Sequence, residues 1–322
     1  MGIMLPNTNG AAVAIFALVS AGRLPAMINF TAGAANILAG CASAKVKTLI
    51  TSRGFVEKGK LDKLVSAIEE SVRIIYLEDV GADVSWVDKL RALIGHRRAL
   101  APREVDDPAV ILFTSGSEGA PKGVVLSHKN MLANVAQAAA CIDFGRTDKV
   151  FNVLPIFHCF GLNAGFVLPL VSGVPVYLYP SPLHYKIVPE LVYASNATVL
   201  FGTDLSFRVM RASRMLMISA RYLYPRRRRA REGGDAKYLV GEIRHSHSRR
   251  LRCDRDVSSA CSQHSDVQQI RHGRPFDPGI EHRLDPVPGV NDGGRLFVRG
   301  PNVMLGYLKV DNPGVLQPPQ EG

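Results

Sequence analysis

Hydrophobic and polar positions alternate with two different periods along the first two hundred residues. Short apolar runs typical of buried strands occupy residues 3–5, 48–51, 73–77, 109–113, 150–154, 174–179 and 198–201. Longer apolar or amphipathic runs typical of helices lie between them, at residues 11–21, 32–46, 60–72, 86–94, 127–141, 162–171 and 185–195. Strands that alternate with helices predict βαβ units, so we expect an α/β fold with largely parallel sheets and flanking helices.

This pattern is lost in residues 206–277, an arginine-rich segment. Its part up to Arg274 holds 17 basic and 6 acidic residues, which accounts for the whole net charge of +11. Such a segment is ordinarily a solvated basic loop or a disordered insert, and a nucleic-acid-binding arm is the alternative. Regular patterning returns after Gly279. The chain therefore divides into a core (1–205), an anomalous segment (206–277) and a partial return to the core (278–322).

Composition narrows the class of protein. With 47% hydrophobic and 21% charged residues, the chain has a globular composition, which excludes global disorder. The five cysteines are scattered and show no CxxC spacing, as expected for reduced thiols in a cytoplasmic protein. The longest apolar run, residues 11–22, is too short to span a bilayer, and we expect no signal peptide.

One segment, residues 114–124, carries recognisable chemistry. It follows a predicted strand directly and is crowded with glycine and hydroxyl residues, which leave backbone N–H groups and hydroxyls facing phosphate oxygens. Lys122 adds a mobile cation. It is followed by Gly123 rather than Ser or Thr, which excludes a Walker loop, and Ser115 replaces the glycine of a nucleophile elbow. A flexible Gly-Ser turn is the alternative to a phosphate site.

Residues 111–124 resemble the phosphate-binding signature of the adenylate-forming (AMP-binding) enzymes, which include acyl-CoA synthetases, luciferases and peptide-synthetase adenylation domains. Further segments match this superfamily in the expected order, at residues 154–161, 201–203 and 300–307. Residues 5–7, 25–33 and 179–192 are similar to one branch of it, the acyl-acyl carrier protein synthetase half of bifunctional 2-acylglycerophosphoethanolamine acyltransferases.

The resemblance implies the large N-terminal subdomains of an adenylate-forming enzyme. It also implies a ligase that uses ATP and Mg²⁺ to convert a fatty acid into an acyl-adenylate, for transfer to acyl carrier protein, CoA or a lysophospholipid. The implied phosphate-binding residues are Thr114, Ser115, Gly116, Ser117, Gly119, Lys122 and Gly123. Lys122 and His158 are the implied catalytic residues, with His158 near the acyl carboxylate or the pyrophosphate exit. A packed core histidine is the alternative for His158.

The sequence also departs from the family. Its Tyr-Gly-x-Thr-Glu motif, whose Glu holds Mg²⁺, belongs within residues 206–277, where nothing matches it, and we hypothesise that this segment is an out-of-frame translation. The ribose-binding Asp and the C-terminal lid domain with its adenylation Lys are not found either, and we expect that domain to be absent.

Whether the chain is an active enzyme therefore stays open. The hypotheses are an impaired acyl-activating ligase, an inactive fragment of that family, and a basic protein that binds nucleic acid or anionic lipid. We expect no specific nucleic-acid partner, and a cytoplasmic location with association at the inner membrane surface.

Overall fold

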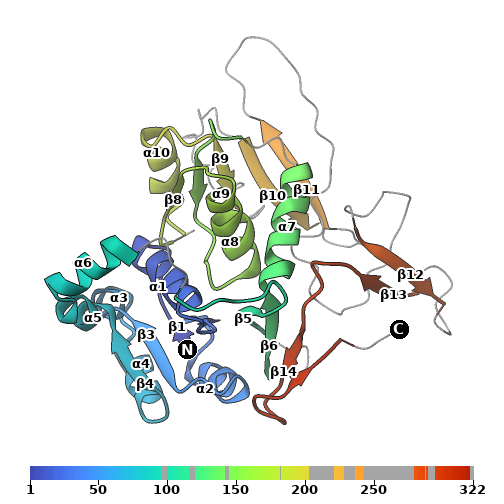
Figure 1. Cartoon of the computed structure of the whole chain (residues 1–322). Helices are drawn as coiled ribbons and strands as arrows, with labels where there is room; N and C mark the ends of the chain where they lie inside the picture. Colours follow the sequence, from blue (N-terminus) through green and yellow to red (C-terminus); the bar gives the residue numbers. More distant parts are fainter. Residues whose placement is uncertain are drawn as a thin grey trace. The chain divides into compact units, whose positions relative to one another are not determined.

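The computed structural model describes residues 1–95, 100–115, 120–141, 145–181, 183–202, 221–227, 236–242, 279–286, 288 and 294–319. The chain divides into two units, a first formed by Met1–Lys129 with Met304–Glu321 and a second formed by Asn130–Val303. Each described unit is built on its own mixed sheet with helices packed on it (Figure 1). The predicted α/β class is confirmed.

The described strands of the first unit form one eight-stranded sheet in the order β15-β14-β6-β5-β2-β1-β3-β4. The five strands from β5 to β4 are parallel to one another, and β6, β14 and β15 continue the sheet in antiparallel pairs. The strands are β1 (Gly2–Ile3), β2 (Ala26–Met27), β3 (Thr48–Thr51), β4 (Arg73–Tyr76), β5 (Pro108–Ser115), β6 (Pro121–Ser127), β14 (Gly306–Leu308) and β15 (Leu316–Gln317).

Helices of the first unit connect its parallel strands. They are α1 (Asn9–Ser20), α2 (Ala34–Ser43), α3 (Arg53–Gly59), α4 (Asp62–Glu69), α5 (Leu77–Asp83) and α6 (Trp86–Gly95). Hydroxyl side chains begin two of them, because Thr8 accepts the backbone N–H of Ala11 at 3.3 Å and Ser52 accepts that of Phe55 at 3.4 Å. Buried apolar side chains from α2, α4 and the parallel strands, such as Leu49, pack into one core cluster. None of the described helices, α1 included, is long and apolar enough to cross a bilayer.

The described strands of the second unit form a sheet in the order β11-β10-β9-β7-β8, in which only β11 is antiparallel to its neighbour. They are β7 (Val150–Asn152), β8 (Val176–Leu178), β9 (Val199–Phe201), β10 (Arg221–Arg227) and β11 (Ala236–Glu242). A separate hairpin joins β12 (Glu281–Asp285) to β13 (Arg295–Arg299).

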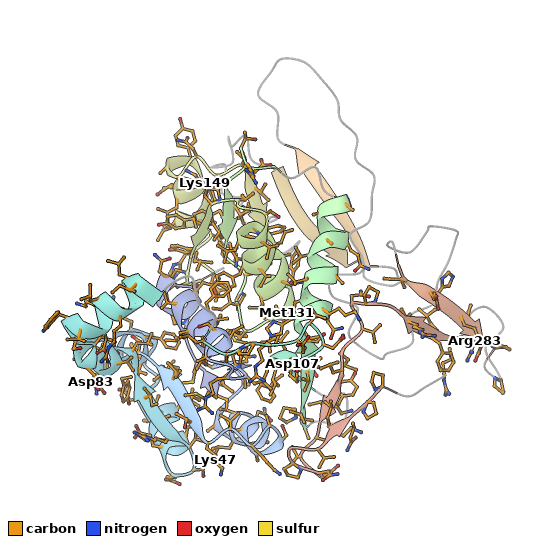
Figure 2. All side chains as sticks on the ribbon, in the orientation of Figure 1. Lys47, Asp83, Asp107, Met131, Lys149 and Arg283 are labelled. Atoms are coloured by element: carbon orange, nitrogen blue, oxygen red, sulfur yellow. The ribbon has the colours of Figure 1, made fainter. Side chains whose placement is uncertain are left out.

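Alternation along β7 and β9 gives this sheet two apolar faces. Phe151 and Leu200 belong to a cluster with residues of α10 (Ile187–Ala194). Val150 and Phe201 belong to another cluster, with residues of α7 (His128–Cys141), α8 (Cys159–Leu162) and α9 (Leu168–Val171). Lys149, labelled in Figure 2, anchors the start of β7 by donating from Nζ to the Ser195 carbonyl at 2.6 Å. Helices of the second unit therefore pack on both faces of its sheet.

Several predicted elements shift in the structure. The strand expected at 48–51 is β3 with the same bounds, whereas β6 occupies residues at which we predicted no strand. The helix expected at 162–171 begins at Cys159 and contains a π-helical turn, η1 (Asn163–Val167). Both β10 and β11 lie inside residues 206–277, for which we expected no regular structure, and the out-of-frame hypothesis for that segment stays a prediction.

Candidate functional site

The β5–β6 hairpin of the first unit holds the two ends of the predicted phosphate segment. Thr114 lies opposite Lys122 in the antiparallel ladder, and Ser115 lies opposite Pro121. Residues directly opposite in such a pair place their side chains on the same face of the sheet, about 5 Å apart at Cβ. Both side chains are half-buried. The hairpin therefore presents a hydroxyl and an ammonium together on one face.

The neighbouring pair, Phe113 and Gly123, explains which face this is. Phe113 packs on α2, because a Cβ placed on Gly40 would lie 3.2 Å from the phenyl Cδ1 atom. A Cβ on Gly123 would lie 3.3 Å from both the Ile111 Cγ2 and the Leu308 Cβ atoms, which is tighter than most real contacts. Since side chains alternate along a strand, Thr114 and Lys122 project from the face of the sheet opposite α2.

A distant segment completes the hairpin's surroundings. β14 lies beside β6, with Leu308 opposite Gly123 and Gly306 opposite Val125, and the Leu305 N–H donates to the Val125 carbonyl at 2.9 Å. The end of the matched segment 300–307 is thereby joined to the matched segment 111–124 in one sheet (Figure 1). The structure brings together two signature segments that lie about 180 residues apart in the sequence.

Part of the predicted site lies outside the described residues. This holds for Gly116, Ser117 and Gly119, and of Ser115 only the main chain, paired with Pro121, is described. Their roles as phosphate-binding residues stay predictions. The described part of the site consists of Thr114, Lys122 and Gly123.

His158 belongs to the second unit and caps α8. Its Nδ1 atom accepts the Phe160 N–H at 3.3 Å and lies 3.8 Å from the Cys159 Sγ atom. A neutral imidazole whose Nδ1 accepts carries its hydrogen on Nε2, so the far side of this ring is a hydrogen-bond donor. The side chain is exposed, which contradicts the packed-core alternative for this residue. Its catalytic role stays a prediction.

A buried asparagine, which sequence reasoning missed, shapes the loop that carries His158. Asn152 ends β7 and is fully buried; its Oδ1 atom accepts the Leu154 N–H at 3.0 Å and its Nδ2 atom donates to the Gly161 carbonyl at 3.2 Å. One amide thus joins the start of the 153–158 loop to the helix that follows it. The only sequence signal was a polar residue in an otherwise apolar run.

Two glycines let the helix approach this asparagine. A Cβ on Gly165 would overlap the Asn152 amide group, and a Cβ on Gly161 would overlap the Pro155 carbonyl oxygen. They lie four residues apart, on one side of the α8–η1 segment, and a π-helical turn of this kind often marks a functional site. Close packing of the helix main chain on the Asn152 side chain and on the Pro155 carbonyl therefore holds the His158 loop in place.

Amide side chains also follow one side of α7 in the second unit. Asn130, Asn134 and Gln137 are buried at a spacing of three and four residues. Asn130 Nδ2 donates to the Pro301 carbonyl at 2.8 Å, and Asn134 Oδ1 accepts a hydrogen bond from Asn163 Nδ2. These bonds attach α7 to the start of segment 300–307 and to the π-helical turn.

The residues present suit a nucleotide phosphate better than a metal ion. Thr114 and Lys122 are hydrogen-bond donors on one face of the sheet, as phosphate oxygens require. In the part of the chain that the structure describes, no group of three or more His, Cys, Asp or Glu residues lies together as metal ligands. We therefore assign no described residue to Mg²⁺.

Comparison with known proteins gives one family. The family model described as "AMP-binding enzyme" matches residues 1–247, so its match extends into the arginine-rich segment. The chain is 27% identical over 204 residues to 4-coumarate–CoA ligase 1 of Petroselinum crispum, a match that covers 62% of this chain and 36% of the ligase. It is 30% identical over 139 residues to the peroxisomal long chain acyl-CoA synthetase 6 of Arabidopsis thaliana, covering 43% and 20% of the two chains.

A solved structure shares the fold. The O-succinylbenzoate coenzyme A synthetase of Bacillus subtilis, in complex with ATP and magnesium ion, superposes with a TM-score of 0.64 at 17% identity. The superposition covers 95% of this chain and 62% of the synthetase. The chain thus spans about a third of the first curated relative it matches and less than two thirds of this structure.

Proposed function

Because this chain belongs to the AMP-binding enzyme family, we propose that it activates a fatty acid with ATP through an acyl-adenylate. The acyl group would then pass to the thiol of CoA or acyl carrier protein, as the first step of lysophospholipid reacylation. The observation that carries the proposal is the Thr114–Lys122 pair, which flanks the glycine- and serine-containing residues 115–119 in the sequence. Enzymes of this family use ATP with Mg²⁺, as the ATP-bound structure of a neighbour illustrates.

The hairpin would bind the phosphates of ATP. The Thr114 hydroxyl donates a hydrogen bond to a phosphate oxygen, and the Lys122 ammonium neutralises the charge that gathers on pyrophosphate as it leaves. Because strand pairing holds both residues in place before the substrate arrives, little reorganisation accompanies the reaction. Mg²⁺, when bound, supplies further neutralisation of phosphate charge.

The His158 loop would orient the carboxylate of the acid. A carboxylate oxygen attacks the α-phosphorus, the new O–P bond forms as the bond to pyrophosphate breaks, and no proton has to move. The Nε2–H of His158 can donate to the second carboxylate oxygen. Phe160, buried against Phe201 with ring centroids 5.8 Å apart, stabilises the backbone on which this loop ends.

Two observations support a fatty acid and its acceptors. One relative is a long chain acyl-CoA synthetase, and several others are CoA ligases by name. Residues 179–192 are similar in sequence to the acyl-acyl carrier protein synthetase branch, and within them the Tyr179 hydroxyl lies 2.8 Å from the His184 Nδ1 atom. The five cysteines are scattered along the sequence without CxxC spacing, a pattern that suits a cytoplasmic location for this chemistry.

ATP–pyrophosphate exchange tests the proposal. The full chain is incubated with ATP, Mg²⁺, labelled pyrophosphate and palmitate, 4-coumarate or acetate, with a sample without acid as background. We expect exchange to depend on acid and to be fastest with palmitate, and hydroxylamine trapping to confirm the acyl-adenylate. The product is then offered CoA, acyl carrier protein or lysophospholipid. Exchange at background with every acid would refute the proposal and favour an inactive fragment of the family.

A further inference from the structure

Helix α6 exposes an unusual amount of apolar surface. Trp86, Leu90, Leu93 and Ile94 are 75%, 47%, 70% and 77% exposed, and none of the ten residues of this helix is buried. Scattered apolar residues on a surface are normal, but these four share one helix and recur at the i, i+4, i+7 and i+8 positions of an amphipathic face. In Figure 1 this helix follows α5, whose last residue, Asp83, is labelled in Figure 2.

Charged residues are placed at the edges of this apolar face. Successive residues turn by about 100°, so the four apolar side chains occupy an arc of roughly 100°. Lys89 lies about 40° beyond one edge of the arc, and Arg91 lies about 40° beyond the other edge when half-buried Val87 is counted with the apolar side chains. Asp88, the only acidic residue of the helix, lies on the opposite side. Long basic side chains at the edges of an apolar face are typical of helices that lie in a membrane interface.

The helix forms without burying its apolar side. Ser85 and Asp88 make a capping box: Asp88 Oδ2 accepts from the Ser85 N–H at 3.1 Å and from its hydroxyl at 2.6 Å, while Ser85 Oγ accepts the Asp88 N–H at 3.2 Å. The hydroxyl hydrogen bond and the backbone hydrogen bond from Ser85 lower the pKa of the Asp88 carboxyl, which keeps the cap charged. A helix of ten residues is marginal in water on its own, so burial of its apolar face elsewhere would stabilise it.

We infer that α6 is an interfacial helix that docks this chain on an anionic lipid bilayer, with Trp86, Leu90 and Ile94 inserted among the acyl chains. Charge complementarity selects this occupant. Residues 86–98 hold four basic residues, Lys89, Arg91, Arg97 and Arg98, and one acidic residue, Asp88. This net positive charge attracts anionic headgroups and repels a second copy of the same segment. The inference does not depend on catalytic activity, although a bilayer is where fatty acids and lysophospholipids are found.

The molecule carries its own reporter, because Trp86 is the only tryptophan in the sequence. The full chain is titrated with vesicles of phosphatidylglycerol and phosphatidylcholine, or of phosphatidylcholine alone, while tryptophan emission and co-sedimentation are recorded. We expect emission to shift to shorter wavelength with the anionic vesicles. The variant L90E/I94E should bind at least tenfold more weakly, and K89Q/R91Q about fivefold more weakly for each charge removed.

A control is Y193E, which places one acidic side chain, against two in L90E/I94E, on another exposed helical position, 72% exposed in α10 of the second unit. Y193E should bind anionic vesicles and show the same emission shift as the parent. All variants should keep the parent's melting temperature because the altered residues are exposed. Equal binding of the parent to neutral and anionic vesicles would overturn the inference. Unchanged sedimentation of L90E/I94E with anionic vesicles would also overturn it, because another part of the chain would then bind the bilayer. An emission shift that follows protein concentration without lipid would identify a second copy as the occupant and overturn it too.

Discussion

The two units hold their candidate site residues by different physical means. In the first, Thr114 and Lys122 sit opposite each other in an antiparallel ladder, and main-chain hydrogen bonds fix their positions while both side chains stay half-buried. In the second, exposed His158 ends a loop that depends on a buried amide, Asn152, and on two close approaches of main chain at glycines. A ladder tolerates a change of side chain, whereas a packed interior does not.

This difference predicts how substitutions should affect each unit. A substitution at the hairpin should alter chemistry and leave folding intact. A substitution around Asn152 should reduce the free energy of unfolding first and affect chemistry only through the position of the His158 loop. Four measurements, taken from the largest expected effect to the smallest, test that contrast.

Lys122→Ala should remove a charge that acts on the leaving pyrophosphate. We expect the rate of ATP–pyrophosphate exchange to fall about 100- to 1000-fold, roughly 3–4 kcal/mol of transition-state stabilisation, with an unchanged melting temperature. Lys58→Ala, at an exposed lysine of α3, is the control and should keep the parent's rate. A normal rate for Lys122→Ala would remove this residue from the site, and a large loss of stability would contradict the account of the ladder.

Gly161→Ala should be the most damaging change in the second unit. The added methyl would overlap the Pro155 carbonyl oxygen, a main-chain atom that cannot rotate away. We expect a loss of about 3 kcal/mol in the free energy of unfolding, measured by urea denaturation of the full chain. Gly145→Ala in the same unit meets no atom within 4 Å and should stay within about 0.5 kcal/mol of the parent. Equal stabilities for the two variants would refute the close approach.

Asn152 and Gly165 should be energetically coupled. Gly165→Ala would force a methyl against the Asn152 amide, and Asn152→Ala would leave the Leu154 N–H and the Gly161 carbonyl without that partner, so each should cost about 2 kcal/mol. The double variant should cost at least about 1 kcal/mol less than the sum, because the smaller side chain at 152 makes room for the methyl. Strict additivity of the two costs would show that the residues do not share this space.

Glu78 provides a smaller, pH-dependent test in the first unit. Burial opposes ionisation of this carboxyl, but hydrogen bonds from the Ser52 hydroxyl and from the Arg53 and Gly54 N–H groups outweigh it and lower the pKa from 4.5 to about 2. A lowered pKa in the folded state means that the contribution is present above pH 4.5 and is lost as the pH falls towards 2.

The side chain of Glu78 is exposed, so solvent screening limits this contribution to at most about 1 kcal/mol. The parent should lose that much more stability than Glu78→Gln between pH 4.5 and pH 2, as followed by urea denaturation at each pH. Parallel pH profiles for the two proteins would show that these hydrogen bonds do not stabilise the fold.

Local periodicity predicted four of the five parallel strands of the first sheet and missed β2. The run at 48–51 is β3, and the run at 86–94 is α6 with one further residue. β6 was not predicted as a strand, because it contains Pro121 and Gly123, and both residue types are rare inside strands. The strand exists because β5 and β14 pair with it on its two sides, and β14 lies far along the chain.

The residues of the candidate site also fall into those that the sequence predicted and those that it did not. Thr114, Lys122 and His158 could be named from short motifs, because phosphate chemistry demands hydroxyls, glycines and a cation within a few residues of each other. Asn152 could not, since its partner at Gly161 and the close approach at Gly165 depend on how a loop returns to a helix. A spacing of four between two glycines in an apolar run was visible, but periodicity alone does not say which atom fills the space beside them.

The position of β14 has a consequence for synthesis of the chain. One edge of β6 is paired by residues 306–308, so on the ribosome that edge stays open until residue 308 has been translated. An open strand edge in a nascent polypeptide invites pairing with other chains. Chaperone capture during translation should therefore continue until residue 308 has left the exit tunnel.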